Sequence, residues 1–145
     1  MKLYIKKLCD SAIIPTRATD CSAGLDLCAC ADTDIVIKPH EIVKIHTGIA
    51  VMPDTSDVVL LIFARSGIAS KYAIAPVNAV GVIDSDYRGE IIIPLINHGS
   101  EPFAITNGMR IAQLVALPCF FPQICETEVL TDTVRGNGGF GSTGL

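Results

Sequence analysis

Residues 58–63 read V-V-L-L-I-F and residues 90–96 read E-I-I-I-P-L-I, and these two stretches decide the fold class. Both are apolar at consecutive positions, whereas a strand with one face in water alternates apolar and polar residues. Strands of this kind are covered on both faces, either by a second sheet or by a neighbouring subunit. The two stretches therefore predict buried β-strands.

Short apolar runs recur along the whole chain at intervals of about 8–12 residues, separated by Pro, Gly, Asp and Asn, which is typical of an all-β sandwich or barrel. We predict one short helix from Gly67 to Tyr72, with Ser66 as its N-cap. The predicted strands are residues 3–8, 24–28, 34–37, 41–51, 57–63, 77–83, 89–97, 103–106, 110–120 and 124–129. The fold class is therefore all-β: a distorted jelly roll, or barrel-like sandwich, with one short helix.

The composition indicates one domain with surplus apolar surface. The chain has 145 residues, half of them hydrophobic, and a mean hydropathy of +0.48. No apolar run reaches the length of a membrane span, and lysines at 2, 6 and 7 argue against a signal peptide. A net charge of −4 without a basic stripe argues against nucleic acid as a partner. We expect neither nucleic acid nor membrane as partner, and we infer a homo-oligomer that covers the surplus apolar surface.

Six cysteines and three histidines are spread along the chain without the spacing of a zinc site. There is no C-x-x-C pair, so we read the cysteines as reduced thiols, several of them buried. Cys9 and Cys125 are candidate reactive thiols, to which the sequence assigns no role.

The stretch R-G-N-G-G-F-G-S-T-G at residues 135–144 contains five of the twelve glycines. So many glycines disfavour helix and strand and let backbone N–H groups turn towards an anion. Arg135, Ser142 and Thr143 add donors, and Phe140 offers a ring that can stack on a base. The stretch is either a flexible flap that closes over a nucleotide or a disordered tail, and its composition leaves both interpretations open.

The stretch N-A-V-G-V-I-D-S-D-Y-R-G-E at residues 78–90 carries a candidate general base. Asp84 follows an apolar strand, where a rigidly held carboxylate can take a proton from water. However, Asp-Ser-Asp is also ordinary turn chemistry, so this stretch alone does not decide between the two interpretations.

Three further stretches place polar side chains in or beside apolar strands: A-G-L-D-L (23–27), A-R-S-G-I-A (64–69) and R-I-A-Q-L (110–114). Asp26 either pairs with an arginine or takes part in metal binding. Ser66 either caps the helix or binds an anion at its N-terminus, with Arg65 contacting phosphate or bracing the site. Gln113 either orients a water or phosphate inside a site or lies at an exposed edge.

The five stretches, with the fourth extended to G-M-R-I-A-Q-L (108–114), follow the order of the five motifs of the trimeric dUTPases (deoxyuridine triphosphate nucleotidohydrolases). The chain resembles this family from Ala23 to Gly144, and the stretches at 78–90 and 135–144 are the most specific. Two departures are Ala64 where proline is common and Met109 where an acidic residue is common. Neither position carries chemistry.

The resemblance implies a Mg²⁺-dependent enzyme that hydrolyses dUTP to dUMP and pyrophosphate by water attack on the α-phosphorus. This reaction limits uracil incorporation into DNA and supplies dUMP for thymidylate synthesis. Asp84 would be the general base, Gln113 would order the triphosphate and the water, and Asp26 would hold Mg²⁺ indirectly through a bound water. The implied substrate-binding residues are Arg65, Ser66, Gly67, Asn78, Gly81, Val82, Ile83, Tyr87, Arg135, Phe140, Gly141, Ser142 and Thr143.

The resemblance also implies a homotrimer with shared active sites. The motifs around Asp26, Arg65 and Gln113 would come from one chain, the motif of Asp84 from a second and the Gly-rich motif from a third. Residues 1–134 would form the jelly-roll domain, and residues 135–145 a mobile flap that completes a neighbouring site. The expected location is cytoplasmic, or nuclear for a eukaryotic or viral protein.

Two other functions remain as alternatives. A deoxycytidine triphosphate deaminase shares this fold and nucleotide class, but its chains are usually longer and need a carboxylate beside the cytosine ring. A nucleotide-gated binding protein would signal through a partner, which usually needs an inserted segment or an extension. The complete set of catalytic motifs favours the hydrolase.

Overall fold

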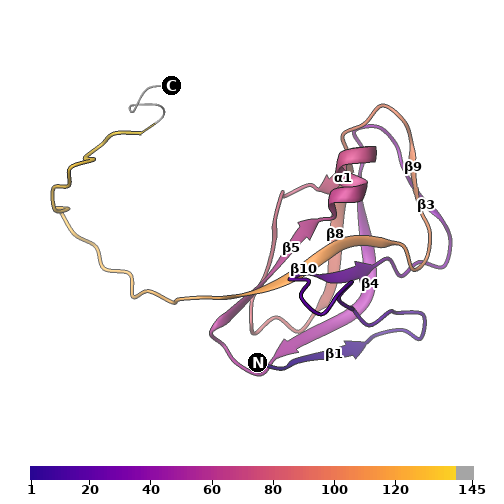
Figure 1. Ribbon diagram of the computed structural model, residues 1–145, viewed down its shortest axis with the longest axis horizontal. Helices are drawn as coiled ribbons and strands as arrows, with labels where there is room; N and C mark the ends of the chain where they lie inside the picture. Colours follow the sequence, from indigo (N-terminus) through magenta and orange to yellow (C-terminus); the bar gives the residue numbers. More distant parts are fainter. Residues whose placement is uncertain (140–145) are drawn as a thin grey trace.

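Two four-stranded sheets enclose one core in the computed structural model, which describes residues 1–139 (Figure 1). The first sheet has the order β1-β4-β8-β6 and contains β1 (Leu3–Lys7), β4 (Ile42–Pro53), β8 (Glu90–Asn97) and β6 (Ile74–Pro76). The second has the order β2-β10-β5-β7 and contains β2 (Leu25–Cys28), β10 (Arg110–Pro118), β5 (Val58–Ala64) and β7 (Gly81–Ile83). A smaller ladder pairs β3 (Ile35–Ile37) with β9 (Phe103–Ile105), and α1 (Ser66–Tyr72) follows β5. The predicted jelly-roll-like, all-β fold with one short helix is confirmed.

Aliphatic side chains fill the space between the sheets. The fully buried ones include Leu27, Ile37, Ile45, Leu60, Ile91, Ile93, Leu95, Ile111 and Leu114. Along β5, Val58, Leu60 and Ile62 are buried, whereas Val59, Leu61 and Phe63 on the opposite face are only half-buried. Within a single chain, therefore, only one of the two apolar faces of β5 is buried in the core.

Two local predictions between β5 and β8 are wrong. Residues 77–83 do not form one strand, because a turn separates β6 from β7 and Ala79 has a φ of 61° within it. Ser66 is not the N-cap of α1: Arg65 is, with no side-chain cap bond, and Ser66 is the first helical residue. The Ser66 hydroxyl is thus left for another role.

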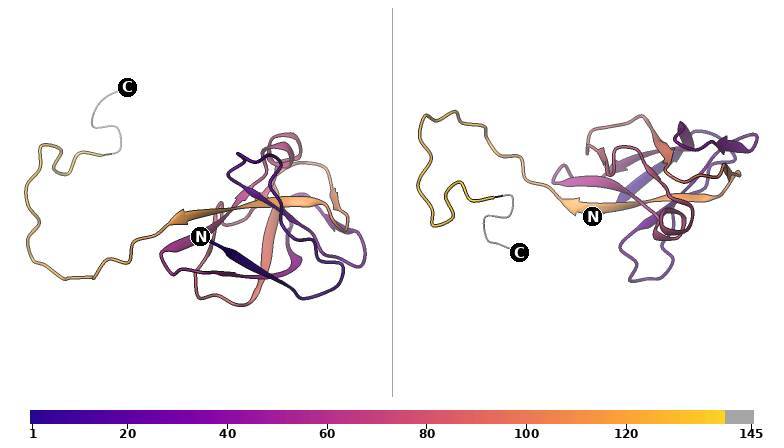
Figure 2. Two further views of the ribbon diagram at one scale, coloured as in Figure 1. Left: turned by 60° about the horizontal axis from the view of Figure 1, so that its bottom comes forward. Right: turned by 90° about the horizontal axis from the view of Figure 1, so that it is seen from above.

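The predicted strand at residues 124–129 is also wrong. From Cys119 to Gly139 the described chain contains no strand and leaves the sheets as an extended tail (Figures 1 and 2). Its apolar side chains are exposed, with Phe120 at 91%, Ile124 at 88% and Leu130 at 83%. An apolar run favours a strand only where a neighbouring strand is available to pair with it. No helix within residues 1–139 combines the length and the hydropathy needed to cross a membrane.

Candidate active site

Three of the predicted motifs meet in one pocket at the end of β5. Because β10 lies between β2 and β5, the pairing brings Gln113 level with both Asp26 and Phe63. The pocket has a volume of about 340 Å³ and is lined by Ala18, Ser22, Ala23, Gly24, Asp26, Arg65, Ser66, Gly67 and Gln113. Side chains that are distant in the sequence therefore line one pocket within a single chain.

Asp26 is held by two arginines at the base of this pocket. Nε of Arg65 donates to Oδ1 at 2.8 Å, and Nη1 of Arg110 donates to Oδ2 at 3.1 Å. The Asp26 side chain is 16% exposed and that of Arg110 is 54% exposed. The structure thus supports arginine pairing for Asp26, and two guanidinium charges against one carboxylate leave a positive balance that suits an anionic ligand.

The part played by Arg110 was missed from the sequence. Arg110 pairs with Cys28 across the β10–β2 ladder, which places it diagonally opposite Asp26. Opposite charges in such cross-strand positions attract each other. The contact between Arg110 and Asp26 can be predicted only when the register of β10 against β2 is known.

Gln113 is fixed inside the pocket and does not lie at an exposed edge. Its Nε2 donates to the backbone oxygen of Ala64 at 2.9 Å. Its Oε1 lies against Gly24, where a Cβ atom would come within 2.5 Å of it. Any side chain at position 24 would therefore displace the Gln113 amide, which explains why glycine precedes the apolar strand of Asp26.

The start of α1 forms another wall of the pocket. The first helical bond runs from the Ala69 N–H to the Arg65 oxygen, at 3.0 Å. The N–H groups before Ala69 have no partner within the helix. Ser66 and Gly67 are both exposed, and a Cβ at Gly67 would meet no atom within 4 Å. A ligand group can therefore approach this backbone closely.

Asp84 lies in a different place. Ile83 pairs with Leu60, so Asp84 stands level with Val59 at the opposite end of β5 from Ala64. Five strand residues span about 17 Å, which separates Asp84 from the pocket within one chain. Asp84 lines a second cavity of about 540 Å³, together with Asp86, Phe121 and neighbouring residues.

Tyr87 follows Asp84 in a braced turn. Its backbone N–H donates to the Asp84 oxygen at 3.1 Å, and its hydroxyl donates to the Glu90 oxygen at 3.0 Å. A Cβ at Gly89 would collide with the Tyr87 hydroxyl, so the ring lies directly over this glycine. The ring is thus held in one orientation while remaining exposed to a ligand.

The other predicted base-binding residues belong to β7 and the turn before it. Asn78 is exposed in that turn, and Gly81, Val82 and Ile83 form β7 itself. As the edge strand of its sheet, β7 directs backbone groups away from β5, where they can bind a ligand. In the Gly-rich stretch, Nε of Arg135 donates to the Gly138 oxygen at 2.9 Å. The remaining predicted residues, Phe140, Gly141, Ser142 and Thr143, lie outside the described residues.

A family model described as dUTPase matches residues 10–144 of this chain. The chain belongs to the dUTPase family. A curated deoxyuridine 5'-triphosphate nucleotidohydrolase of Desulfitobacterium hafniense is 52% identical to it over 132 residues, covering 91% of this chain and 87% of that protein. The predicted enzyme class, a dUTP diphosphatase that acts in nucleotide metabolism, is confirmed.

Solved structures of dUTPases have the same fold. A mutant of the dUTPase of Staphylococcus bacteriophage 80alpha, solved with dUpNHpp, has a TM-score of 0.91 at 27% identity, and the match covers 99% of each chain. A mutant of the dUTPase from phage phi11 of S. aureus, whose structure describes the coordination of a structural Mg(II) ion, has a TM-score of 0.82 at 24% identity. The match covers 91% of this chain and 100% of that chain.

We expect replacement of Asp26 by asparagine to lower the melting temperature by roughly 3–8 °C, because Arg65 and Arg110 lose a shared counter-charge worth about 1–2 kcal/mol. Thermal unfolding at a fixed protein concentration measures this effect. Asp34→Asn is the matched control, since Asp34 is exposed. Equal melting temperatures for both variants would show that the ion pairs do not stabilise the fold.

Proposed function

We propose that the chain hydrolyses dUTP to dUMP and pyrophosphate by attack of an Asp84-activated water on the α-phosphorus. The observation that carries this proposal is the pocket in which Arg65, Ser66, Gly67 and Gln113 converge. Its donors suit the triphosphate, and stabilising the charge of the leaving pyrophosphate is the main electrostatic task of the reaction. Gln113, whose orientation is fixed by Ala64 and Gly24, would order the triphosphate and the water.

The residues of the pocket fit a Mg²⁺ ion held mainly by phosphates and waters. Asp26 is the only carboxylate among the described residues that line the pocket, and residues 1–139 contain no group of three or more acidic, histidine or cysteine side chains placed to hold a metal ion. Each Asp26 oxygen accepts one arginine bond and keeps a second lone pair, which suits a metal-bound water. When bound, the ion would neutralise phosphate charge.

We propose a homotrimer in which Asp84 and the phosphate pocket of one active site come from different chains. The separation of about 17 Å along β5 supports this arrangement, because a single chain cannot bring both to one phosphorus atom. The outer face of the second sheet also supports an oligomer. Val59, Leu61 and Val82 lie side by side there, and Val82 is 61% exposed. A neighbouring subunit would cover this apolar face.

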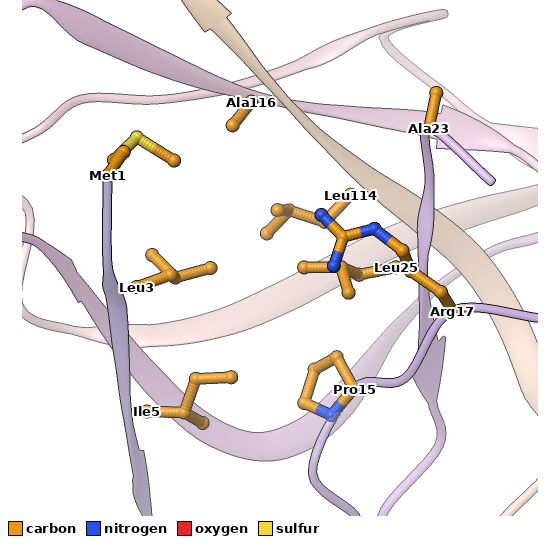
Figure 3. A pocket seen from close by; sticks show the side chains of 9 residues that line it. All are labelled: Met1, Leu3, Ile5, Pro15, Arg17, Ala23, Leu25, Leu114 and Ala116. Carbon is orange, nitrogen blue, oxygen red and sulfur yellow. The ribbon is translucent and has the colours of Figure 1, made fainter. Parts of the chain in front are cut away.

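Two further apolar surfaces support contacts between chains. The backbone of residues 119–134 runs away from the sheets (Figure 2), and this segment has exposed aromatic and aliphatic side chains. A groove of about 450 Å³ lies between the edge strands β1 and β2, where Leu3 and Ile5 face Pro15 and Leu25, and the Arg17 side chain lies among these apolar residues (Figure 3). Burying such surface stabilises association by about 25 cal/mol per Å² before the entropic costs of binding.

The flap and the location of the protein complete the proposal. Residues 1–134 would be the enzyme domain, and residues 135–145 would close over the phosphates and base of a neighbouring site. Arg135, Ser142 and Thr143 would contact the phosphates, and Phe140 and Gly141 would lie at the base. The bacterial origin of the curated relative supports a cytoplasmic location.

Specificity would arise from the turn and edge strand around Asp84. The backbone of residues 78–83, assisted by the Asn78 amide, would bind uracil and leave no room for the methyl group of thymine. Tyr87 would pack under deoxyribose and exclude a 2′-hydroxyl. Its hydroxyl is engaged by the Glu90 oxygen, so the ring cannot turn aside easily.

Replacing Tyr87 by alanine should therefore relax the preference for deoxyribose. A buried hydroxyl without a partner costs about 1–3 kcal/mol, so we expect the ratio of kcat/KM for dUTP over UTP to fall by roughly 5- to 150-fold. Tyr87→Phe keeps the ring but loses its bond to the Glu90 oxygen, so this matched control should lower the ratio far less than Tyr87→Ala. An unchanged ratio for Tyr87→Ala would contradict packing of the ring under the sugar.

Pyrophosphate release with Mg²⁺ tests the proposed function directly. We expect turnover of dUTP and very slow turnover of dTTP, dCTP and UTP. Ammonia release from dCTP would instead identify a deaminase. Tight binding of dUTP without either product would identify a nucleotide-gated binding protein.

A further inference from the structure

Two thiols lie in contact in a cavity separate from the phosphate pocket. Sγ of Cys9, just after β1, is 2.8 Å from Sγ of Cys30, just after β2. The Ser11 hydroxyl lies 3.2 Å from the Cys30 sulfur and 3.6 Å from the Cys9 sulfur. Cys9 is exposed, and both sulfur atoms open into a cavity of about 500 Å³ that also contains His46 and Glu90. Solutes can therefore reach the pair.

The backbone of β4 holds the two cysteines together. The Leu8 N–H donates to the Gly48 oxygen at 2.7 Å, and the Cys30 N–H donates to the His46 oxygen at 2.8 Å. Gly48 has a φ of +67°, and a Cβ there would come within 2.7 Å of the Cys9 sulfur and 2.9 Å of the Cys30 sulfur. The two sulfur atoms thus occupy the space that a side chain at position 48 would fill.

The side chain of Glu90 fixes this segment of β4. Its Oε1 accepts the Gly48 N–H at 2.8 Å, and its Oε2 lies 2.8 Å from Nδ1 of His46. Burial raises the pKa of Glu90, but the hydrogen bonds from His46 and from the Gly48 backbone outweigh it and lower the pKa overall. Glu90 is therefore a negatively charged side chain in the same cavity as the thiols, and its bond to the Gly48 N–H holds Gly48 in place.

We propose that Cys9 and Cys30 form a reversible redox pair, which a peroxide converts to a disulfide. The Cys9 thiolate would attack one peroxide oxygen, breaking the O–O bond and releasing water after protonation, and would become a sulfenic acid. The Cys30 sulfur would then attack the Cys9 sulfur. The S–S bond forms, the S–O bond breaks, and the hydroxyl leaves with the Cys30 proton as water.

Exposure, supported by the hydrogen bonds around each sulfur, assigns the two roles within the pair. Hydrogen bonds from Cys30 and Ser11 lower the pKa of the Cys9 thiol, and Cys9 is the more exposed of the two. The hydrogen bond to Cys9 raises the pKa of the Cys30 thiol. The thiolate is the form that reacts with oxidants, so Cys9 reacts first and Cys30 resolves the sulfenic acid.

The disulfide would close the segment from Cys9 to Cys30 into a loop. This segment contains β2 with Asp26, and Ala18, Ser22 and Gly24 from the wall of the phosphate pocket. Cross-linking a loop of this length restricts the unfolded chain, so we expect oxidation to raise the melting temperature by roughly 5–10 °C. We also expect slower amide hydrogen exchange in residues 10–29.

The test uses the full chain, reduced first and then treated with hydrogen peroxide. Free thiols are blocked with N-ethylmaleimide, and the cross-linked peptides are assigned by fragmentation mass spectrometry. We expect a Cys9–Cys30 bond that dithiothreitol reverses together with the rise in melting temperature. Cys30→Ser should instead accumulate a Cys9 sulfenic acid that dimedone traps, and Cys21→Ser is the matched control that keeps the disulfide.

Three results would overturn the proposal. One is modification of the exposed Cys21 or Cys125 before Cys9, and another is a disulfide between other cysteines. The third is a Cys9–Cys30 bond that leaves the melting temperature unchanged. These readouts do not depend on turnover, so they stand or fall separately from the proposed hydrolysis.

Discussion

Replacing Asp84 by asparagine is expected to lower the turnover number for dUTP by roughly 10²–10⁴-fold while nearly preserving substrate binding. Asparagine has the same shape but cannot accept the proton of the attacking water. The turn itself should survive, because its hydrogen bonds do not use the Asp84 carboxylate: the Tyr87 N–H donates to the backbone oxygen of Asp84, and Nη1 of Arg88 donates to the backbone oxygen of Ser85. Initial rates of pyrophosphate release and calorimetric binding of dUTP measure the two quantities separately.

Asp86→Asn is the matched control for this prediction. Asp86 is exposed in the same turn and lines the same cavity as Asp84, so both variants remove one charge from one place. We expect near-normal turnover for Asp86→Asn. Near-normal turnover for Asp84→Asn would show that Asp84 is not the general base. Equal losses in both variants would show that the negative charge of the turn matters, and not the position of one carboxylate.

Ending the chain at Val134 is expected to leave a folded trimer with turnover reduced by roughly 100-fold or more, because a closing segment that positions the substrate is lost. Within residues 1–139 the fully buried core residues all lie before Cys119, so the deletion removes none of these core side chains. Light scattering and thermal unfolding check the assembly, and pyrophosphate release measures the loss. A truncated enzyme with full activity would contradict the flap.

Mixing the two defective chains tests whether active sites are shared. In a trimer that contains both, an Asp84→Asn chain can supply the flap and a chain ending at Val134 can supply Asp84. Random assembly of equal amounts would give mixed trimers with one complete site each, about a quarter of the unmodified activity overall. Co-expression of the tagged chains measures this recovery, and activity no higher than that of the separate variants would show that each site belongs to one chain.

Strands whose apolar residues find a partner within the chain could be predicted from the sequence. β5 and β8 were predicted to within one residue at each end, because their composition favours a strand and their core face is buried in this chain. The prediction at 124–129 had the same local character but has no pairing strand in the structure. The break before β7 depends on the left-handed conformation of Ala79, which no local preference of alanine indicates.

The residues of the candidate site could be predicted from the sequence, but the contacts and distances between them could not. The motifs named Asp26, Arg65 and Gln113, and the structure places them around one pocket. Arg110 escaped notice because its contact with Asp26 depends on the register of β2 against β10. The resemblance implied that Asp84 comes from a second chain, but the distance between that pocket and Asp84 within one chain follows only from the pairing of β7 with the far end of β5.

Because Asp84 and the phosphate pocket lie about 17 Å apart along β5, activity would depend on the concentration of chains as well as on their folding. In the proposed arrangement a newly synthesised chain can be fully folded and still be inactive, because its Asp84 carboxylate acts only on a substrate bound in the phosphate pocket of another chain. Activity would then rise with a power of the concentration of chains rather than in proportion to it. A small fall in the concentration of chains would then remove more active sites than chains, whereas a chain with a damaged flap would disable only the one site that its flap completes.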